Sequence, residues 1–442
     1  MTTRPSDVPA TGTGRTIHLS ELLKRPITDR QGESFGRVED VIVRLRGRQD
    51  PVVTGLVAKV GGREVFVPIE QTGTFDGAEL KLTSAKLDLR RFERRDGEVL
   101  LRADVLGHRL IDVQSAHLIR AADLELQERP SEQGGMEWVL AGVDTQRGPG
   151  ALLRLLRPDK GEPAGHTFRD WARFEPLIGH ASSAGIRGQF ARIRRLKPAQ
   201  IADLLEEASK SEETEILGHV HDDPELEADV FEELDEDRAT RLLGERSDAE
   251  IAEVLARMRA DDAADAIAEL PQQRRQHVLD LLPTGQRTKV LTLMGFNPTS
   301  AGGLMGVDFL ALAHDTAVAE ALAAVSASES LQPEALTSVH ALDPSGRLEG
   351  VATLVRLLQA DPGARLVDVC DPDPVRIGAD TDVVDVAVLM SDYNLITIPV
   401  VDDNRRMIGL ITVDDVLEVT LPEDWRRRET AEPPDAHHGT PE

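Results

Sequence analysis

Residues 379–419, ADTDVVDVAVLMSDYNLITIPVVDDNRRMIGLITVDDVLEV, decide the fold of the C-terminal part of this 442-residue chain. Apolar residues recur at helical spacing from Val383 to Met390. Two short β-branched runs follow, separated by a polar turn, and the second run ends at Thr412 before another amphipathic segment. The order helix, strand, turn, strand, helix predicts a small α/β unit.

This unit is present twice. Asp343 to Leu358 aligns with Asp402 to Leu417 at an offset of 59 residues, and an earlier helical pattern precedes each copy. Three pairs in the alignment are identical: Arg347 and Arg406, Gly350 and Gly409, Thr353 and Thr412. Repetition at a fixed offset indicates a duplicated domain. We therefore expect two similar α/β units, over residues 301–362 and 363–424.

The second copy resembles the CBS-domain signature, because Ile398-Pro399-Val400 is followed by the run GLITVDD, residues 409–415. The resemblance implies a pseudo-symmetric pair with clefts that can bind an adenine nucleotide such as ATP. Thr412 would contact a phosphate, Asp415 the ribose hydroxyls, and the backbone of Ile398, Pro399 and Val400 the base. A carboxylate accepts from a diol, and a hydroxyl at a helix N-terminus suits an anion.

The first copy departs from this signature. It has Arg356 where the signature has the aspartate, so we expect at most one good nucleotide site. A CBS pair that binds no nucleotide remains the alternative.

A longer part of the chain, from about Pro198 to Leu421, resembles the cytosolic region of the MgtE magnesium-transporter family. The segments IADLLEEA, DDAADAIAELP and TSAGGLM match in order, followed by the stretch quoted first. The resemblance implies that a helical N-domain and a CBS dimer close around Mg²⁺ ions. Mg²⁺ needs one or two carboxylates and keeps several waters, so loosely placed carboxylates suffice.

The resemblance also implies which carboxylates hold these ions. The candidate magnesium ligands are Asp261, Asp262, Asp382, Asp385, Asp415 and Glu418. Val384 and Asn394 stand where the family commonly has acidic ligands, so fewer or weaker ion sites are expected. For Asp261 and Asp262, N-capping of a helix is the alternative role.

Helical spacing runs through residues 196–300, where Ala-Asp-x-apolar-x-Glu occurs at 202–207, 228–233 and 264–269. Repeats of short helices stack because none buries its apolar face alone. Residues 201–269 carry 24 acidic and 6 basic side chains. Such a charge opposes compaction unless cations collect there.

Charge is divided unevenly along the chain. Residues 1–200 hold 32 basic and 27 acidic side chains, whereas residues 201–442 hold 19 and 51, for a net charge of −27 over the whole chain. This acidity argues against nucleic acid as a partner. The single Cys370 excludes a disulfide framework and suits a reducing cytosol.

Other functional signals are weak. No stretch has the roughly 18 apolar residues of a membrane span, so we expect no transport by this chain itself. No nucleophile or phosphate-loop motif is found, so we expect no enzyme. His219-Val-His221-Asp222-Asp223 has metal-like residue types, but a surface turn between helices is the favoured alternative.

The N-terminal half has β-branched runs punctuated by glycine turns, which predict strands. Residues 28–43 align with residues 111–126 at an offset of 83, with identical Asp, Gln, Arg and Asp positions. The first copy, PITDRQGESFGRVEDVIV, resembles the PRC-barrel family of small interaction modules. The expected segments are a disordered leader 1–15, PRC-like units 16–97 and 98–160, a linker 161–195 and a disordered tail 425–442.

Together these patterns predict a multidomain α+β chain: a small N-terminal β-barrel, a middle all-α helical-repeat superhelix and a C-terminal α/β CBS-domain pair. The expected function is a cytoplasmic, magnesium-responsive regulatory protein that dimerises through the CBS pair. An unknown protein would bind the PRC-like part and could bring the chain to a membrane. The alternatives are an interaction scaffold, with or without nucleotide, and a cytosolic subunit acting in trans on a magnesium channel.

Overall fold

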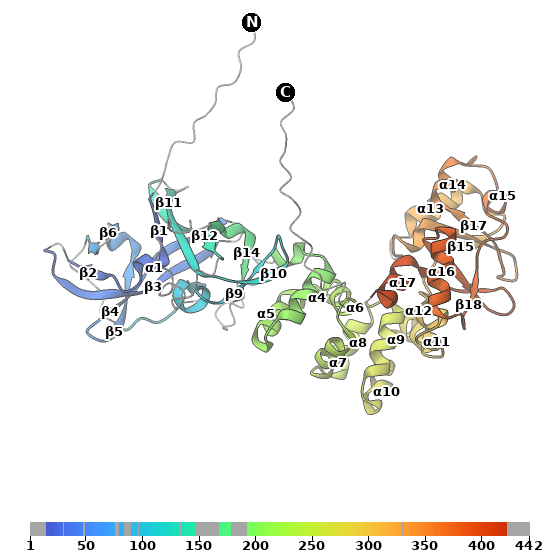
Figure 1. The fold of residues 1–442 in the computed structure, drawn as a ribbon, viewed down its shortest axis with the longest axis horizontal. Helices are drawn as coiled ribbons and strands as arrows, with labels where there is room; N and C mark the ends of the chain where they lie inside the picture. Colours follow the sequence, from blue (N-terminus) through green and yellow to red (C-terminus); the bar gives the residue numbers. More distant parts are fainter. Residues whose placement is uncertain are drawn as a thin grey trace, which may run out of the picture. The chain divides into compact units, whose positions relative to one another are not determined.

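A computed structural model describes most of the chain. The described residues are 15–29, 31–46, 49–75, 79–83, 90–95, 97–131, 134–145, 168–177, 192–328 and 331–421. The chain divides into two units between Glu233 and Leu234. The expected leader, apart from residue 15, and the whole expected tail 425–442 lie outside the described residues. A β-sheet region, a helical region and a C-terminal α/β region follow one another along the chain (Figure 1), so the chain is multidomain, as predicted.

Strands form the N-terminal part of the first unit. They are β1 (Thr16–His18), β2 (Pro26–Thr28), β3 (Ser34–Arg46), β4 (Gln49–Val60), β5 (Arg63–Pro68), β6 (Thr72–Phe75), β7 (Leu80–Leu82), β8 (Glu98–Leu100), β9 (Arg109–Asp112), β10 (His117–Arg120), β11 (Asp123–Pro130), β12 (Met136–Asp144), β13 (Phe168–Asp170) and β14 (Phe174–Pro176). The main sheet runs β1-β11-β12-β4-β3-β2-β7-β6, with β5, β8 and β13 paired to β4, β3 and β12. The order β10-β9-β14 forms a smaller sheet.

The two sequence copies are interlaced in the main sheet. β1, from the first copy, pairs with β11 of the second, placing Ile17 opposite Leu126. β8, from the second copy, pairs with β3 of the first, placing Val99 opposite Val43. β4 and β12 also pair with each other. Neither copy therefore completes its sheet alone.

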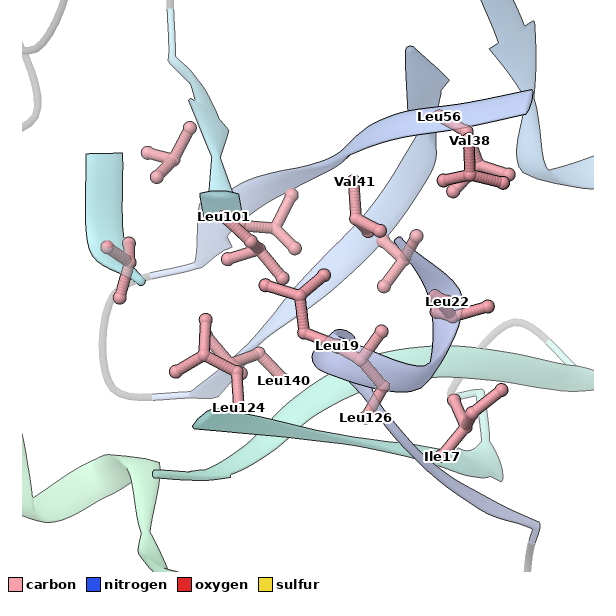
Figure 2. Packing of buried hydrophobic residues seen from close by; sticks show 14 of the residues in the cluster. Ile17, Leu19, Leu22, Val38, Val41, Leu56, Leu101, Leu124, Leu126 and Leu140 are labelled. Carbon is pink, nitrogen blue, oxygen red and sulfur yellow. The ribbon is translucent and has the colours of Figure 1, made fainter. Parts of the chain in front are cut away.

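A common hydrophobic core follows from this exchange. The short helix α1 (Leu19–Leu22) inserts Leu19 and Leu22 beside Leu124 and Leu126 of the other copy (Figure 2). The equivalent turn after β8, residues 101–105, buries Leu101 in the same cluster. Each fully buried leucine contributes about 1.5–3 kcal/mol relative to an exposed one.

A buried aspartate from each copy closes the turn of the other. Asp40 in β3 accepts from the backbone N–H of Arg102 (2.7 Å) and Ala103 (3.0 Å). Asp123 in β11 accepts from the backbone N–H of Ser20 at 3.1 Å and from the Ser20 hydroxyl. Asp40 and Asp123 are one of the identical pairs at offset 83. Their shared role in closing a turn explains why both copies have aspartate at this position.

Residues 168–176 belong to the sheet rather than to the linker expected over 161–195. β13 pairs with β12, with Gly142 opposite Asp170, and β14 pairs with β9, with Phe174 opposite Asp112. Phe174 and Trp171 are buried in the common core. Pairing and burial give this short segment the stability that its composition alone does not suggest.

Helices follow in the middle of the chain. The first unit contains α4 (Pro198–Glu207), α5 (Lys210–Val220) and α6 (Pro224–Glu232); the second contains α7 (Glu236–Gly244), α8 (Asp248–Leu255), α9 (Ala260–Glu269), α10 (Gln272–Leu281), α11 (Thr284–Leu293) and α12 (Ala301–Leu304). Ser247 and Glu250 form a capping box that begins α8, and prolines begin α4 and α6. In the second unit α7 packs on α9, α8 on α10 and α9 on α11, so the amphipathic helices bury one another's apolar faces.

The C-terminal region holds two similar α/β halves. The first consists of β15 (Ala311–Ala313), α13 (Val318–Ala327), β16 (Ser338–Leu342), β17 (Leu348–Thr353) and α14 (Leu354–Gln359). After α15 (Leu366–Val369), the second consists of β18 (Ile377–Gly378), α16 (Val383–Tyr393), β19 (Thr397–Val401), β20 (Met407–Thr412) and α17 (Val413–Thr420). The halves meet at residues related by the offset of 59: the Ser338 and Thr397 hydroxyls are 3.0 Å apart. Each half has a three-stranded sheet, β15-β16-β17 or β18-β19-β20.

Asp40→Ala should destabilise the first unit by about 3 kcal/mol, because the backbone N–H groups of Val41, Arg102 and Ala103 lose their acceptor. Asp29→Ala is the control: Asp29 accepts from two backbone N–H groups in an exposed turn, so its loss should cost about 1 kcal/mol or less. Denaturant unfolding, followed by fluorescence of Trp138 and Trp171 in this unit, measures both. Equal losses for the two variants would contradict the role given to Asp40.

A second prediction concerns Glu175, which is buried in β14. Burial raises the pKa of Glu175 to about 8, and the nearby Arg192 only partly opposes this. The folded state therefore holds the proton more tightly than the unfolded state. This stabilising contribution is complete below the unfolded pKa near 4.5 and is lost as the pH rises to about 8.

Between pH 5 and 8, wild-type stability should therefore fall more steeply than that of Glu175→Gln, by up to about 1.4 kcal/mol per pH unit. Denaturant unfolding of both proteins across this range measures the difference. Parallel pH profiles would show that Glu175 is ionised in the folded protein.

Candidate functional site

The first turn of α9 and the first turns of α17 come together around one guanidinium. Arg259, the residue before α9, donates from Nε to Asp262 Oδ2 at 2.6 Å and from Nη1 to Asp415 Oδ1 at 3.0 Å. Its Nη2 lies 4.0 Å from Glu418 Oε2. We call Arg259, Asp261, Asp262, Asp415 and Glu418 the Arg259 cluster. The helical region and the second α/β half meet at this cluster.

Asp415 is held on both sides. Its Oδ2 accepts from the Thr412 backbone N–H at 3.0 Å and from the Thr412 hydroxyl at 2.6 Å, which closes the first turn of α17 as a capping box. Burial raises the pKa of Asp415 to about 6, although Thr412 and Arg259 both oppose the rise. The Asp415 side chain is only 10 % exposed.

Further acidic residues surround the cluster. Burial raises the pKa of Asp261, and the nearby Glu418 adds to the effect. Burial, together with repulsion from Asp261, Glu236 and Glu269, raises the pKa of Asp265 to about 6. One guanidinium therefore leaves an excess of negative charge along α9. Such a site favours a hard cation with oxygen ligands.

Asp261, Asp262, Asp415 and Glu418, four of the six candidate magnesium ligands, thus lie in one place. The other two, Asp382 and Asp385, are exposed at the start of α16, where Asp382 caps the helix by accepting from the Val384 N–H at 2.8 Å. Within the described residues, no three His, Cys, Asp or Glu side chains are arranged to hold a metal ion. The Arg259 guanidinium lies instead among the carboxylates.

The two departures from the family pattern have local explanations. Val384 is 61 % exposed on α16. Asn394 ends α16 in the left-handed region, with φ 52° and ψ 47°, a conformation that asparagine tolerates better than most residues.

The nucleotide candidates also lie close together. Ile398, Pro399 and Val400 are buried in β19, the central strand of its sheet, and Thr412 ends the adjacent β20. In the first half, the Thr353 hydroxyl accepts from the backbone N–H of Arg356 and begins α14. The two threonines therefore have equivalent structural roles, whereas the residue three positions later differs in charge.

Sequence reasoning missed Arg259, Asp265, Glu236 and Glu269. Asp265 and Glu269 follow Asp261 at intervals of four residues, so helical periodicity could have placed them on one face of α9. Glu236 comes from α7, which packs on α9, and no spacing in the sequence indicates it.

Two weaker candidates have structural roles. His219 and His221 lie at the end of α5; His221 Nδ1 is 3.1 Å from Glu227 Oε2, and Asp223 caps α6, so this segment is a turn between helices. Cys370 is buried beside Gly350, where an added Cβ would lie 2.6 Å from the Cys370 Cβ. Burial raises the pKa of its thiol to about 11, which makes the thiolate scarce.

Comparison with known families shows which family segments contain the two sides of the Arg259 cluster. Residues 196–299 match the MgtE intracellular N domain, and residues 366–421 match the CBS domain. The chain is MgtE-like in this region. α9 lies in the segment that matches the MgtE intracellular N domain and α17 in the segment that matches the CBS domain, so the Arg259 cluster joins these two segments.

Curated relatives agree. The magnesium transporter MgtE of Thermus thermophilus is 36 % identical over 162 residues, 36 % of each chain. That of Bacillus subtilis is 22 % identical over 231 residues, 52 % of this chain and 51 % of the relative. The chain thus spans about half the length of these relatives or less.

Solved structures include the cytosolic domain of the Mg²⁺ channel MgtE in complex with ATP, at 28 % identity and a TM-score of 0.49, covering 54 % of this chain and 94 % of that one. The soluble part of a magnesium transporter matches at 21 % identity and the same TM-score, covering 54 % and 93 %. Within the described residues, every helix is too short or too polar to cross a lipid bilayer.

Proposed function

We propose that this protein is a non-catalytic regulator that responds to magnesium through its MgtE-like region. The observation that carries the proposal is that carboxylates of the MgtE N domain and of the CBS domain converge at the Arg259 cluster. The matches to the two families and to magnesium transporters support it.

The mechanism is charge neutralisation. Burial and, after it, repulsion from Asp261, Glu236 and Glu269 raise the pKa of Asp265 to about 6, and this repulsion opposes close packing of α9 with its neighbours. A hydrated Mg²⁺ needs only one or two carboxylates, so it can bind there without a closed cage. Its two positive charges offset the repulsion, and the contact between the N domain and the CBS domain tightens.

The finer architecture belongs to the same proposal. We take the middle helices as a helical-repeat superhelix and the N-terminal sheet as a PRC-like module that binds a protein partner. The CBS pair would dimerise through exposed apolar side chains on its helices: Val355 and Leu358 of α14, Val384 and Val388 of α16, and Leu417 of α17. The protein would act in the cytoplasm and reach a membrane only through its partner.

An adenine nucleotide is a second candidate ligand. The CBS match and the adjacent Thr412 and Asp415 favour it, because they put a hydroxyl and a carboxylate at the N-terminus of α17. If it binds alone, without magnesium, the protein is a nucleotide-reading scaffold. Acting in trans on a separate magnesium channel is the other form of the regulatory role.

Magnesium should compact the full-length protein. Small-angle scattering from chelator to millimolar Mg²⁺ should show a falling radius of gyration, and Asp261→Asn/Asp265→Asn should raise the midpoint about tenfold. Glu320→Gln, which removes an exposed charge on α13, should leave the midpoint unchanged. A radius that is indifferent to Mg²⁺ in the wild type would rule out the magnesium response.

Calorimetric titration with ATP, ADP and AMP tests the nucleotide site. Asp415→Ala should weaken binding about tenfold or more, because a carboxylate that accepts hydrogen bonds is lost. Thr353→Ala, the equivalent threonine of the first half, is the control and should bind normally. Binding that survives Asp415→Ala unchanged would place the nucleotide elsewhere.

A further inference from the structure

Arg259 is fixed in position by the backbone. It is the N-cap residue immediately before α9, and its carbonyl accepts from the Ala263 N–H at 2.9 Å, so the side chain leaves from a defined point at the helix start. From there it donates to Asp262 on its own helix and to Asp415 on α17. The Asp262 contact orients the guanidinium toward the CBS domain.

This contact is better shielded than another ion pair in the second unit, between Lys289 of α11 and Asp308, which precedes β15. Lys289 Nζ lies 2.7 Å from both oxygens of Asp308, but the two side chains are 38 % and 51 % exposed. Arg259 is 24 % exposed and Asp415 is 10 % exposed. Solvent screens exposed pairs and leaves them nearly without net effect, whereas charge-assisted hydrogen bonds to buried groups are stronger.

A bound metal ion would place positive charge between the acidic helices. Here the Arg259 guanidinium supplies a positive charge at that position. A planar guanidinium with several donors can contact more than one carboxylate at once. Arg259 does so with Asp262 and Asp415, and it lies within 4.0 Å of Glu418.

We propose that Arg259 is a tethered cation that holds the MgtE N domain against the CBS domain when no divalent ion is bound. The contact between α9 and α17 is thus present in part at all magnesium concentrations. Mg²⁺ then neutralises the negative charge of the carboxylates that Arg259 does not balance. This inference goes beyond the proposed magnesium response: the tether concerns the metal-free protein, and only the effect of Mg²⁺ on it rests on the proposed function.

Hydrogen–deuterium exchange of the full-length protein in chelator tests this. Arg259→Gln should speed exchange of the peptides covering α9 and α17 about tenfold, and millimolar Mg²⁺ should reduce the difference. Arg257→Gln is the matched control. It removes an equal charge two residues before Arg259, from a side chain that donates to the Glu253 carbonyl rather than to α17. It should leave α17 unchanged.

A second variant separates the tether from simple fraying of α9. Asp415→Asn keeps an acceptor for Thr412 but loses the charge that Arg259 meets. In this background Arg259→Gln should have little further effect on α17. Faster exchange in α9 alone, or an undiminished effect in the Asp415→Asn background, would overturn the proposal.

The magnesium response and the tether fail in different ways. A wild type that is indifferent to Mg²⁺ rejects the magnesium response, while the Arg259→Gln effect in chelator still supports the tether. A normal Mg²⁺ response with no Arg259→Gln effect in chelator rejects the tether alone.

Discussion

A carboxylate buried away from water must be given donors or a counter-charge, and this protein meets the requirement in two ways. In the sheet, Asp40 and Asp123 receive backbone N–H groups from the opposite sequence copy. In the second unit, one oxygen of Asp415 accepts a hydrogen bond from Thr412 and the other accepts one from Arg259. Each carboxylate joins segments distant in the chain, because an unsatisfied one would cost more free energy than the contact provides.

The first solution produces a rigid structure. Backbone donors have fixed positions and no charge to titrate, so the hydrogen bonds of Asp40 and Asp123 hold the two sequence copies together. Both copies contribute to one hydrophobic core (Figure 2).

The second solution leaves charge unbalanced. Arg259 meets two carboxylates directly, while Asp265, Glu236 and Glu269 repel one another nearby. Under the proposed function, cation binding would offset this repulsion at the contact between the segments that match the MgtE intracellular N domain and the CBS domain.

The sequence by itself determined the order of the domains, both duplications and the identity of the acidic helices, since periodicity and repeats are local properties that a single chain displays. It also brought forward Asp261, Asp262, Asp415 and Glu418, which the structure places together. Only the tertiary structure showed that the N-terminal copies exchange strands, that residues 168–176 complete their sheet, and that Arg259 occupies the centre of the acidic contact. These features depend on pairings between residues far apart in the chain, such as 24 positions between Asp144 and Phe168 and 156 between Arg259 and Asp415. Such a pairing depends on packing and on the free-energy cost of burying charge, and the spacing of residues along the chain predicts neither.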